Sequence, residues 1–206
     1  MPLVNAYCTV PELRDQFADA STNLSTALLE RAINAASRAI DRYTGRRFWL
    51  DTGVAERTYY VANPRVAYVD DIGSRTGLVV RTGTDGVSFP TTLASGVDFI
   101  LEPRNADKYA STGDPFAFWE LRAIGAATFF CDPSRPTLSV TARHGWSAIP
   151  AEVTEATIIK AAALFKRKDA PFGVAGFGEF GAVRISSRMD PDVVELLDRY
   201  CTPGFA

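Results

Sequence analysis

The chain has 206 residues, of which 47% are hydrophobic and 22% are charged, and its 22 basic and 24 acidic residues leave a net charge of −2. This is an ordinary globular composition, and the length suits one large domain or a core with a sizeable insertion. The slightly negative charge excludes a protein that binds nucleic acid tightly through a strongly basic surface. It is compatible with passive contact with DNA.

The cysteines and the apolar segments favour a protein that is made and kept in a cytoplasm. Cys8, Cys131 and Cys201 are far apart and form no Cys-x-x-Cys pair, which favours buried, reduced thiols over a disulfide framework or a zinc site. No apolar run approaches the roughly 20 residues of a transmembrane helix, and the first residues do not resemble a secretory signal. We therefore expect no membrane partner.

Two helices are predicted in the first fifty residues. The shorter one begins near Thr9, which can cap it together with Glu12 in the pattern of a capping box. The longer one lies in the stretch 28–48 and ends at Gly45, where a left-handed cap is least strained. Its inner face is predicted by residues that recur at steps of four and three: Leu29, Ile33, Ala36, Ile40 and Tyr43. This spacing places them on one side of an α-helix.

Between residues 51 and 146 the helical period gives way to short strand-like runs, separated by clusters of Gly, Pro, Asp, Asn and Ser. The predicted runs are residues 57–61, 66–69, 78–81, 97–101, 118–124 and 137–143. In the last run Leu138, Val140 and Ala142 alternate with polar residues, as in a half-buried strand. We predict a β-rich insertion of roughly a hundred residues, the size of a small domain.

Helical periodicity returns after Trp146. Residues 151–168 carry acidic side chains in the first turn and basic ones in the last, which matches the helix dipole at both ends. We predict that this helix packs against the long helix of the N-terminal part. The predicted contact residues of the two helices are Leu29, Ile33, Ala36, Ile40, Ile158, Ala162 and Phe165.

The end of the chain is predicted to be an arm. Residues 169–181 are rich in glycine and indicate a loop, residues 183–186 a short strand, and Asp190 caps a last helix that begins at Pro191. The predicted fold class is thus α+β, with a small helical bundle core, a β-rich insertion between the main helices and an extended C-terminal arm that ends in a short helix. The predicted boundaries are 1–50 and 147–170 for the core, 51–146 for the insertion and 171–206 for the arm.

The sequence offers no set of residues for catalysis, for a metal or for a cofactor. His144 is the single histidine, no serine lies in a Gly-x-Ser-x-Gly turn, and Asp70 and Asp71 indicate a turn rather than a metal site. Residues 176–181 have the spacing Gly-x-Gly-x-x-Gly, but they lead into an extended run instead of opening a helix. We predict a protein that is not an enzyme; an enzyme that uses His144 is an alternative that His144→Ala would test.

Basic residues gather at two predicted helix ends, at positions 42, 46 and 47 and at positions 166–168. Helix C-termini favour cations, so both clusters fit a purely structural role. The alternative is a positive patch that faces DNA or an acidic partner.

Five segments in this order resemble the head-to-tail adaptors, also called head–tail connector proteins, of long-tailed bacteriophages (siphoviruses). They are residues 36–46, 144–150, 165–169, 171–173 and 190–193. The resemblance is closest to adaptors from phages of actinobacteria. It covers both helical ends and the tail of the chain, whereas the β-rich insertion is larger than in minimal members of the family.

This resemblance implies a structural virion protein of the phage neck. Such adaptors form a dodecameric ring that joins the portal to the stopper (head-completion) or tail-terminator protein, and double-stranded DNA passes through the lumen without sequence specificity during ejection. The net charge of −2 fits a channel that does not retain phosphates. The runner-up is a cytoplasmic module that binds nucleic acid or protein and has no catalytic activity.

The C-terminal helix is the predicted portal-binding element, through Val193, Leu196, Leu197 and Tyr200. A helix of about three turns is marginal alone in water and needs an apolar surface to dock on. The glycine-rich segment before it gives the helix reach, and the resemblance implies that C-terminal segments clamp the portal. Docking on its own domain is the alternative.

Overall fold

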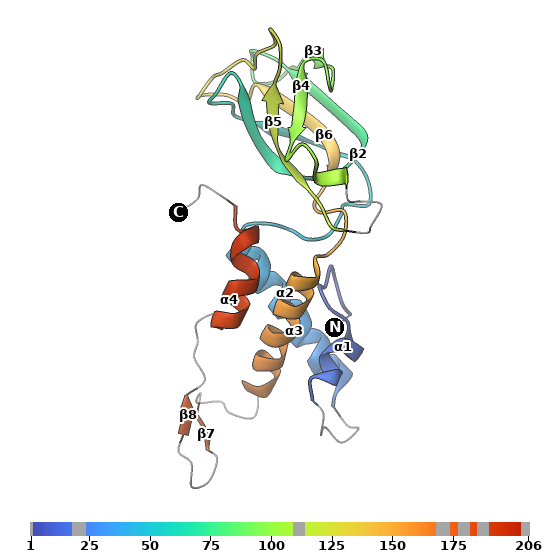
Figure 1. Cartoon of the computed structure of the whole chain (residues 1–206), viewed down its shortest axis with the longest axis vertical. Coiled ribbons are helices and arrows are strands. Elements are labelled where there is room, and N and C mark those ends of the chain that lie inside the picture. Colours follow the sequence, from blue (N-terminus) through green and yellow to red (C-terminus); the bar gives the residue numbers. More distant parts are fainter. Residues whose placement is uncertain are drawn as a thin grey trace. The chain divides into compact units, whose positions relative to one another are not determined.

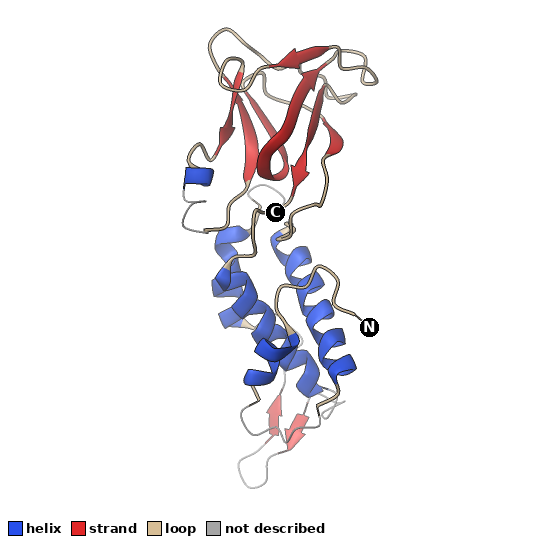
Figure 2. Ribbon diagram, turned by 90° about the vertical axis from the view of Figure 1, so that its right-hand side faces the viewer, coloured by secondary structure: helices blue, strands red, loops and turns tan. Residues whose placement is uncertain are grey.

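The computed structural model describes residues 2–17, 24–108, 114–167, 174–176, 182–184 and 190–202. The chain divides into two compact units, one formed by Met1–Arg46 with Ile149–Ala206 and the other by Arg47–Ala148. Figure 1 labels the elements: α-helices α1 to α4 and a small ribbon belong to the first unit, and a six-stranded sheet belongs to the second. Figure 2 colours the α-helices of the first unit blue and the six-stranded sheet of the second unit red. The predicted α+β class is confirmed.

The two predicted helices of the N-terminal part are present with their predicted caps. Helix α1, Val10–Asp15, begins with a capping box in which Thr9 Oγ1 accepts from the Glu12 N–H and the Glu12 carboxylate accepts from the Thr9 N–H. Helix α2, Thr26–Thr44, ends at Gly45 in the left-handed conformation, with a φ of 69°. A Cβ at Gly45 would lie 2.5 Å from Thr202 Oγ1, so the position requires glycine for space as well as for φ.

Polar residues of α2 hold the first residues of the chain along the helix. The Asn34 amide donates to Pro2 O and accepts from the Val4 N–H, each at 3.1 Å. Ser37 Oγ accepts from the Tyr7 N–H at 3.2 Å. The N-terminal segment thus covers part of the face that the polar pattern of the helix predicts to be solvent-exposed.

The rest of the first unit is built on helix α3, Ala151–Lys166, which packs against α2. Helix α4, Pro191–Leu197, followed by a 3₁₀ turn at Asp198–Tyr200 (η4), packs against α3. The structure places the seven predicted contact residues as follows: Leu29, Ile33, Ala36, Ile40, Ile158 and Phe165 are buried, and Ala162 is partly buried against the same cluster. The ribbon pairs β7, Val174–Gly176, with β8, Ala182–Arg184, in antiparallel fashion.

Ala36 tests the fit between α2 and α3. Its side chain is fully buried in the helical cluster, so Ala36→Leu is expected to overpack the contact and to lower the free energy of unfolding by about 1–3 kcal/mol. Denaturant unfolding followed by far-ultraviolet circular dichroism measures the change. Ala35 is exposed on the same helix, and Ala35→Leu is the control that should be nearly neutral. Equal stability of the two variants would contradict this packing.

The second unit is an antiparallel sheet of β1 Ala55–Tyr59, β2 Val66–Thr82, β3 Thr91–Leu93, β4 Phe99–Glu102, β5 Phe118–Ala123 and β6 Leu138–His144. The strand order is β1-β6-β2-β5-β4. Strand β3 lies outside this order and pairs with the end of β2, on the side opposite to β6. Strand β2 pairs with β5 through its first half and with β6 and β3 through its second half. One long strand therefore belongs to both halves of the sheet.

Strand β2 corrects the sequence prediction at two places. The two predicted runs 66–69 and 78–81 are parts of one strand, and Asp70 and Asp71, which predicted a turn, lie within it. Register shifts between Tyr68 and Val79 bend the strand. Gly77 has a φ of 76° in this bend, a conformation that a residue with a side chain adopts only under strain. Because of this bend, one strand contains both of the runs that the sequence predicts as separate strands.

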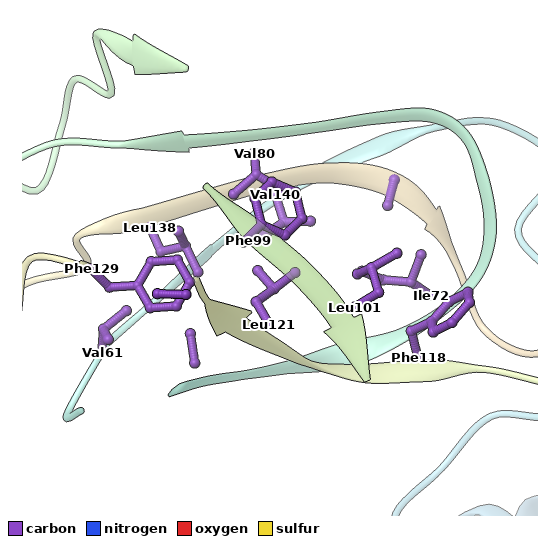
Figure 3. Packing of buried hydrophobic residues seen from close by; sticks show 13 residues of the cluster. Val61, Ile72, Val80, Phe99, Leu101, Phe118, Leu121, Phe129, Leu138 and Val140 are labelled. Carbon is purple, nitrogen blue, oxygen red and sulfur yellow. The ribbon is translucent and has the colours of Figure 1, made fainter. Parts of the chain in front are cut away.

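The interior of the second unit is an apolar cluster supplied by every strand except β1 and β3, together with Val61 and Phe129 (Figure 3). Half-buried Tyr59 of β1 and Leu93 of β3 pack against its edge. The labelled side chains in Figure 3 are Val61, Ile72, Val80, Phe99, Leu101, Phe118, Leu121, Phe129, Leu138 and Val140. Burial of this many large side chains is the main force that stabilises the unit.

Candidate functional site

The apolar face predicted to bind a portal lies against the helical unit itself. Val193 and Leu197 are fully buried, Tyr200 is nearly so, and Leu196 is half-buried. The Tyr200 hydroxyl donates to the Glu152 carboxylate of α3 at 2.9 Å, and burial together with this bond raises the pKa of Tyr200 to about 12. These contacts make α4 part of the packing of its own unit.

The residues after α4 also close the end of α2. The backbone N–H and the Oγ1 of Thr202 both donate to Thr44 O, at 3.1 and 2.9 Å. The buried guanidinium of Arg46 donates from Nε to Tyr200 O at 2.7 Å. Carbonyl groups at a helix C-terminus have no hydrogen-bond donor within the helix. Thr202 supplies donors for the last carbonyl group of α2.

This docking corrects the expectation of a helix that waits for a partner surface. The apolar face of α4 does pack on a surface, as predicted. That surface belongs to α3 of the same chain, and the residues that follow α4 bind the end of α2. A portal contact through Val193, Leu197 or Tyr200 would first require α4 to leave its unit. The portal contact itself stays a prediction.

The members of the two basic clusters differ in their surroundings. Arg46 is buried by the bond just described, and the Lys166 amine lies 5.8 Å from the centre of the Phe17 ring. Arg42 is exposed, and Lys168 lies outside the described residues. Arg46 therefore has a structural role within its own unit, and the alternative of a positive patch that faces DNA stays a prediction.

His144 occupies a structural position at the end of β6. Its ring is fully buried, and Nε2 lies 3.2 Å from Ala55 O, a pairing in which the nitrogen donates. The Nδ1 atom has no hydrogen-bond partner among the described residues. Burial, reinforced by the positive charge of Arg57, lowers the pKa of His144. The ring is neutral near pH 7 and ties β6 to β1.

The lowered pKa of His144 predicts a pH dependence of stability. The unfolded chain takes up a proton near the ordinary pKa of about 6.5, and the folded chain does so only at lower pH. Stability is therefore full above about pH 6.5 and falls as the pH drops below it, by at most about 1.4 kcal/mol per pH unit. His144→Gln keeps a donor but cannot titrate, so it should flatten the slope between about pH 7 and pH 5.5. Urea unfolding followed by tryptophan fluorescence measures it, and equal slopes would contradict the assignment.

Charged residues near β1 are paired with one another. Arg57 Nη1 lies 2.6 Å from Asp70 Oδ2, and its Nη2 lies 3.5 Å from the Asp51 carboxylate. The Tyr59 hydroxyl donates to Asp70 at 3.1 Å, and burial followed by the charge of Asp70 raises the Tyr59 pKa. On the other side of the strand, the Ser139 hydroxyl donates to the Glu56 carboxylate. The network fixes β1 against its neighbours.

The second unit also carries an open groove of about 770 Å³. Its lining is mainly proline, threonine, aromatic and small residues from the segments 62–64, 82–91 and 128–131. Asp85 in this lining accepts from the Val87 and Ser88 N–H groups, which lowers its pKa. Cys131 in the lining is exposed, which corrects the expectation of buried thiols, whereas Cys8 is buried and its pKa is raised to about 12.

Within the described part of the chain, no helix has the length and apolar character needed to cross a membrane. The same residues contain no group of three or more His, Cys, Asp or Glu side chains placed to hold a metal ion.

Comparison with known proteins reveals structural likeness alone. No family model and no curated protein matches the chain. A chain of the neck of the empty gene transfer agent (GTA) particle, solved with C6 symmetry, matches with a TM-score of 0.55 at 17% identity, covering 100% of this chain and 95% of that chain. A chain of the native GTA neck with C12 symmetry matches with a TM-score of 0.54 at 18% identity, covering 100% and 94%.

A third match comes from the virion of the native gene transfer agent particle, with a TM-score of 0.51 at 18% identity and coverage of 100% of this chain and 95% of that chain. In all three matches the likeness extends over both units of the chain and nearly all of the neighbour. At these identities it establishes a shared fold.

Proposed function

We propose that the protein is a structural subunit of a virion neck, where it forms the adaptor ring that joins the portal to the stopper or the tail. The observation that supports this most strongly is the likeness to neck chains over the full length of both units. The ordered segments that resemble phage adaptors point to the same role from the sequence side. The proposal assigns the protein no catalytic step.

The ring is proposed to hold twelve copies around the DNA channel. The C12 symmetry of one neck that contains a chain of this fold supports twelve. Its partners would be the portal on one side and a stopper or tail-terminator protein on the other. A net charge of −2 per copy leaves DNA free to pass, because little counterion release would favour its retention. The finer resemblance to adaptors of actinobacterial phages stays a prediction.

Loss of the protein tests this role. Cells that make particles without this chain are expected to accumulate DNA-filled heads and free tails, and a supplied copy should restore complete particles. Complementation by His144→Gln is the matched control, because a structural histidine tolerates glutamine whereas a catalytic one does not. Complete particles in the absence of the chain would contradict the neck role.

A further inference from the structure

Four strands of the second unit form a regular layer with two opposite edges. In the order β1-β6-β2-β3, β2 has β6 on one side and β3 on the other over the same residues. Three rows of paired residues cross the layer: Tyr59, Leu138, Thr82 and Thr91; Thr58, Ser139, Arg81 and Thr92; and Arg57, Val140, Val80 and Leu93. Because all neighbours are antiparallel, β1 and β3 run in opposite directions at the two edges.

Both edges pair inward without a register shift, although β1 carries Glu56 and Arg57 and β3 is only three residues long and follows Pro90. Strand β1 pairs with β6 over five consecutive residues without a register shift and contains no proline, and β3 is an uncharged Thr-Thr-Leu segment. Within the described residues neither outer edge pairs with another strand. An open edge presents unpaired N–H and C=O groups that can pair with another strand. The edge of β4 is different, because Phe99 O accepts from the Gly96 N–H at 2.7 Å.

The charges on β1 do not oppose an approaching strand. The carboxylate of Glu56 accepts from Ser139, and the guanidinium of Arg57 is held by Asp70 and Asp51. An unpaired charge at an interface would carry a large desolvation penalty. The Arg57 charge is paired within the copy, and the Glu56 carboxylate is hydrogen-bonded to a neutral hydroxyl. A neutral strand such as β3 brings no like charge to either residue.

Exposed apolar residues flank both edges. Val54 and Tyr60, on either side of β1, are 52% and 63% exposed, and Val87 and Val97, on either side of β3, are 86% and 70% exposed. These are single exposed side chains, and their burial against a neighbouring copy would add apolar area to an edge contact.

We propose that β3 of one copy pairs with β1 of the next copy, so that the sheets continue around the ring. This inference rests on the proposed neck function. Pairing two different edges is a heterologous contact, which closes into a ring when the rotation between copies is right. A rotation about an axis along the strands preserves strand direction, so β3 and the neighbouring β1 meet antiparallel. Every copy then loses both of these open edges.

Cysteine pairs across the two edges test the contact in assembled particles. In a Cys131→Ser background, Thr58→Cys is combined in turn with Thr91→Cys, Thr92→Cys and Leu93→Cys, which covers the possible registers within reach of a disulfide. At least one pair is expected to give a ladder of covalent oligomers on a non-reducing gel. Each single variant should stay monomeric and controls for the remaining cysteines.

Three results would overturn the proposal. Necks that contain the chain but yield no ladder with any pair would exclude this edge contact and leave the neck function intact. Dimers from Thr58→Cys alone would indicate that β1 pairs with β1. A chain that is absent from the neck would overturn both the contact and the function.

A charge exchange provides a second readout that does not depend on disulfide geometry. Thr58 and Thr92 are exposed, so Thr58→Lys and Thr92→Lys should leave the melting temperature of the isolated protein unchanged. Combined in one chain, the two lysine variants place like charges across the contact and should lower the yield of complete particles at least tenfold. Thr58→Lys with Thr92→Glu should restore it, and equal yields from both combinations would contradict the pairing.

Discussion

Replacing Leu197 with aspartate is expected to unfold the helical unit while the β unit stays folded. The Leu197 side chain is fully buried where α4 packs on α3, so the substitution removes apolar burial and places a carboxylate in a site without a partner. We expect a loss of about 3–5 kcal/mol of stability in this unit. Removal of residues 190–206 should destabilise it in the same way, because Thr202 and Tyr200 hold the end of α2.

The chain allows the two units to be followed separately. Its three tryptophans, Trp49, Trp119 and Trp146, all belong to the β unit, and the α-helices of the described residues belong to the other. Leu197→Asp should therefore shift the unfolding transition seen by circular dichroism more than that seen by tryptophan fluorescence. Leu28→Asp is the control, since Leu28 is an exposed leucine of α2. Wild-type stability of Leu197→Asp would mean that α4 does not dock on this unit.

Phe99→Ala is expected to have a similarly large effect on the β unit. Phe99 lies in the apolar cluster at the start of β4 and is almost fully buried (Figure 3). Truncation to alanine leaves a cavity that a packed sheet fills poorly, and it should lower stability by about 3–5 kcal/mol. Urea unfolding followed by tryptophan fluorescence measures the loss.

Phe130→Ala is the matched control for this substitution. Phe130 is a partly exposed phenylalanine of the same unit, so its truncation should change stability by well under half as much. If the two variants lost equal stability, the cluster around Phe99 would not be the centre of the unit.

The helices could be predicted from sequence because their signals are local. The capping box at Thr9, the glycine cap at Gly45 and the apolar period of α2 each depend on residues within a few positions of one another. The polar face of α2 was harder to interpret. Asn34 and Ser37 bind the backbone of residues about thirty positions away, and no local pattern reveals such a partner.

The sheet was predicted only in outline because pairing is non-local. Strand β3 has three residues, too few for an alternation pattern, and it exists because it pairs with β2. The bend that joins both halves of β2 depends on shifts against β5 and β6 rather than on its own residues alone. Edge positions, on which the proposed ring contact depends, follow from strand order and therefore could not be obtained from the sequence.

The C-terminal helix shows where sequence reasoning stops in the candidate site. The apolar face of α4 predicts that the helix needs a surface, and the burial of Val193 and Leu197 agrees with that need. Whether the surface belongs to the same chain or to a partner depends on tertiary packing, which periodicity does not encode. What α4 offers to a partner while docked is its outer side, with Asp192 and Glu195 exposed.

A reconstruction of the neck in particles that carry this chain tests the central claim most directly. Electron cryomicroscopy of complete particles, without imposed symmetry, should show density for both units of the chain in a closed ring of twelve copies between the portal and the tail, with the channel open along the axis. A neck that lacks this density, or that holds a single copy off the axis, would contradict the account.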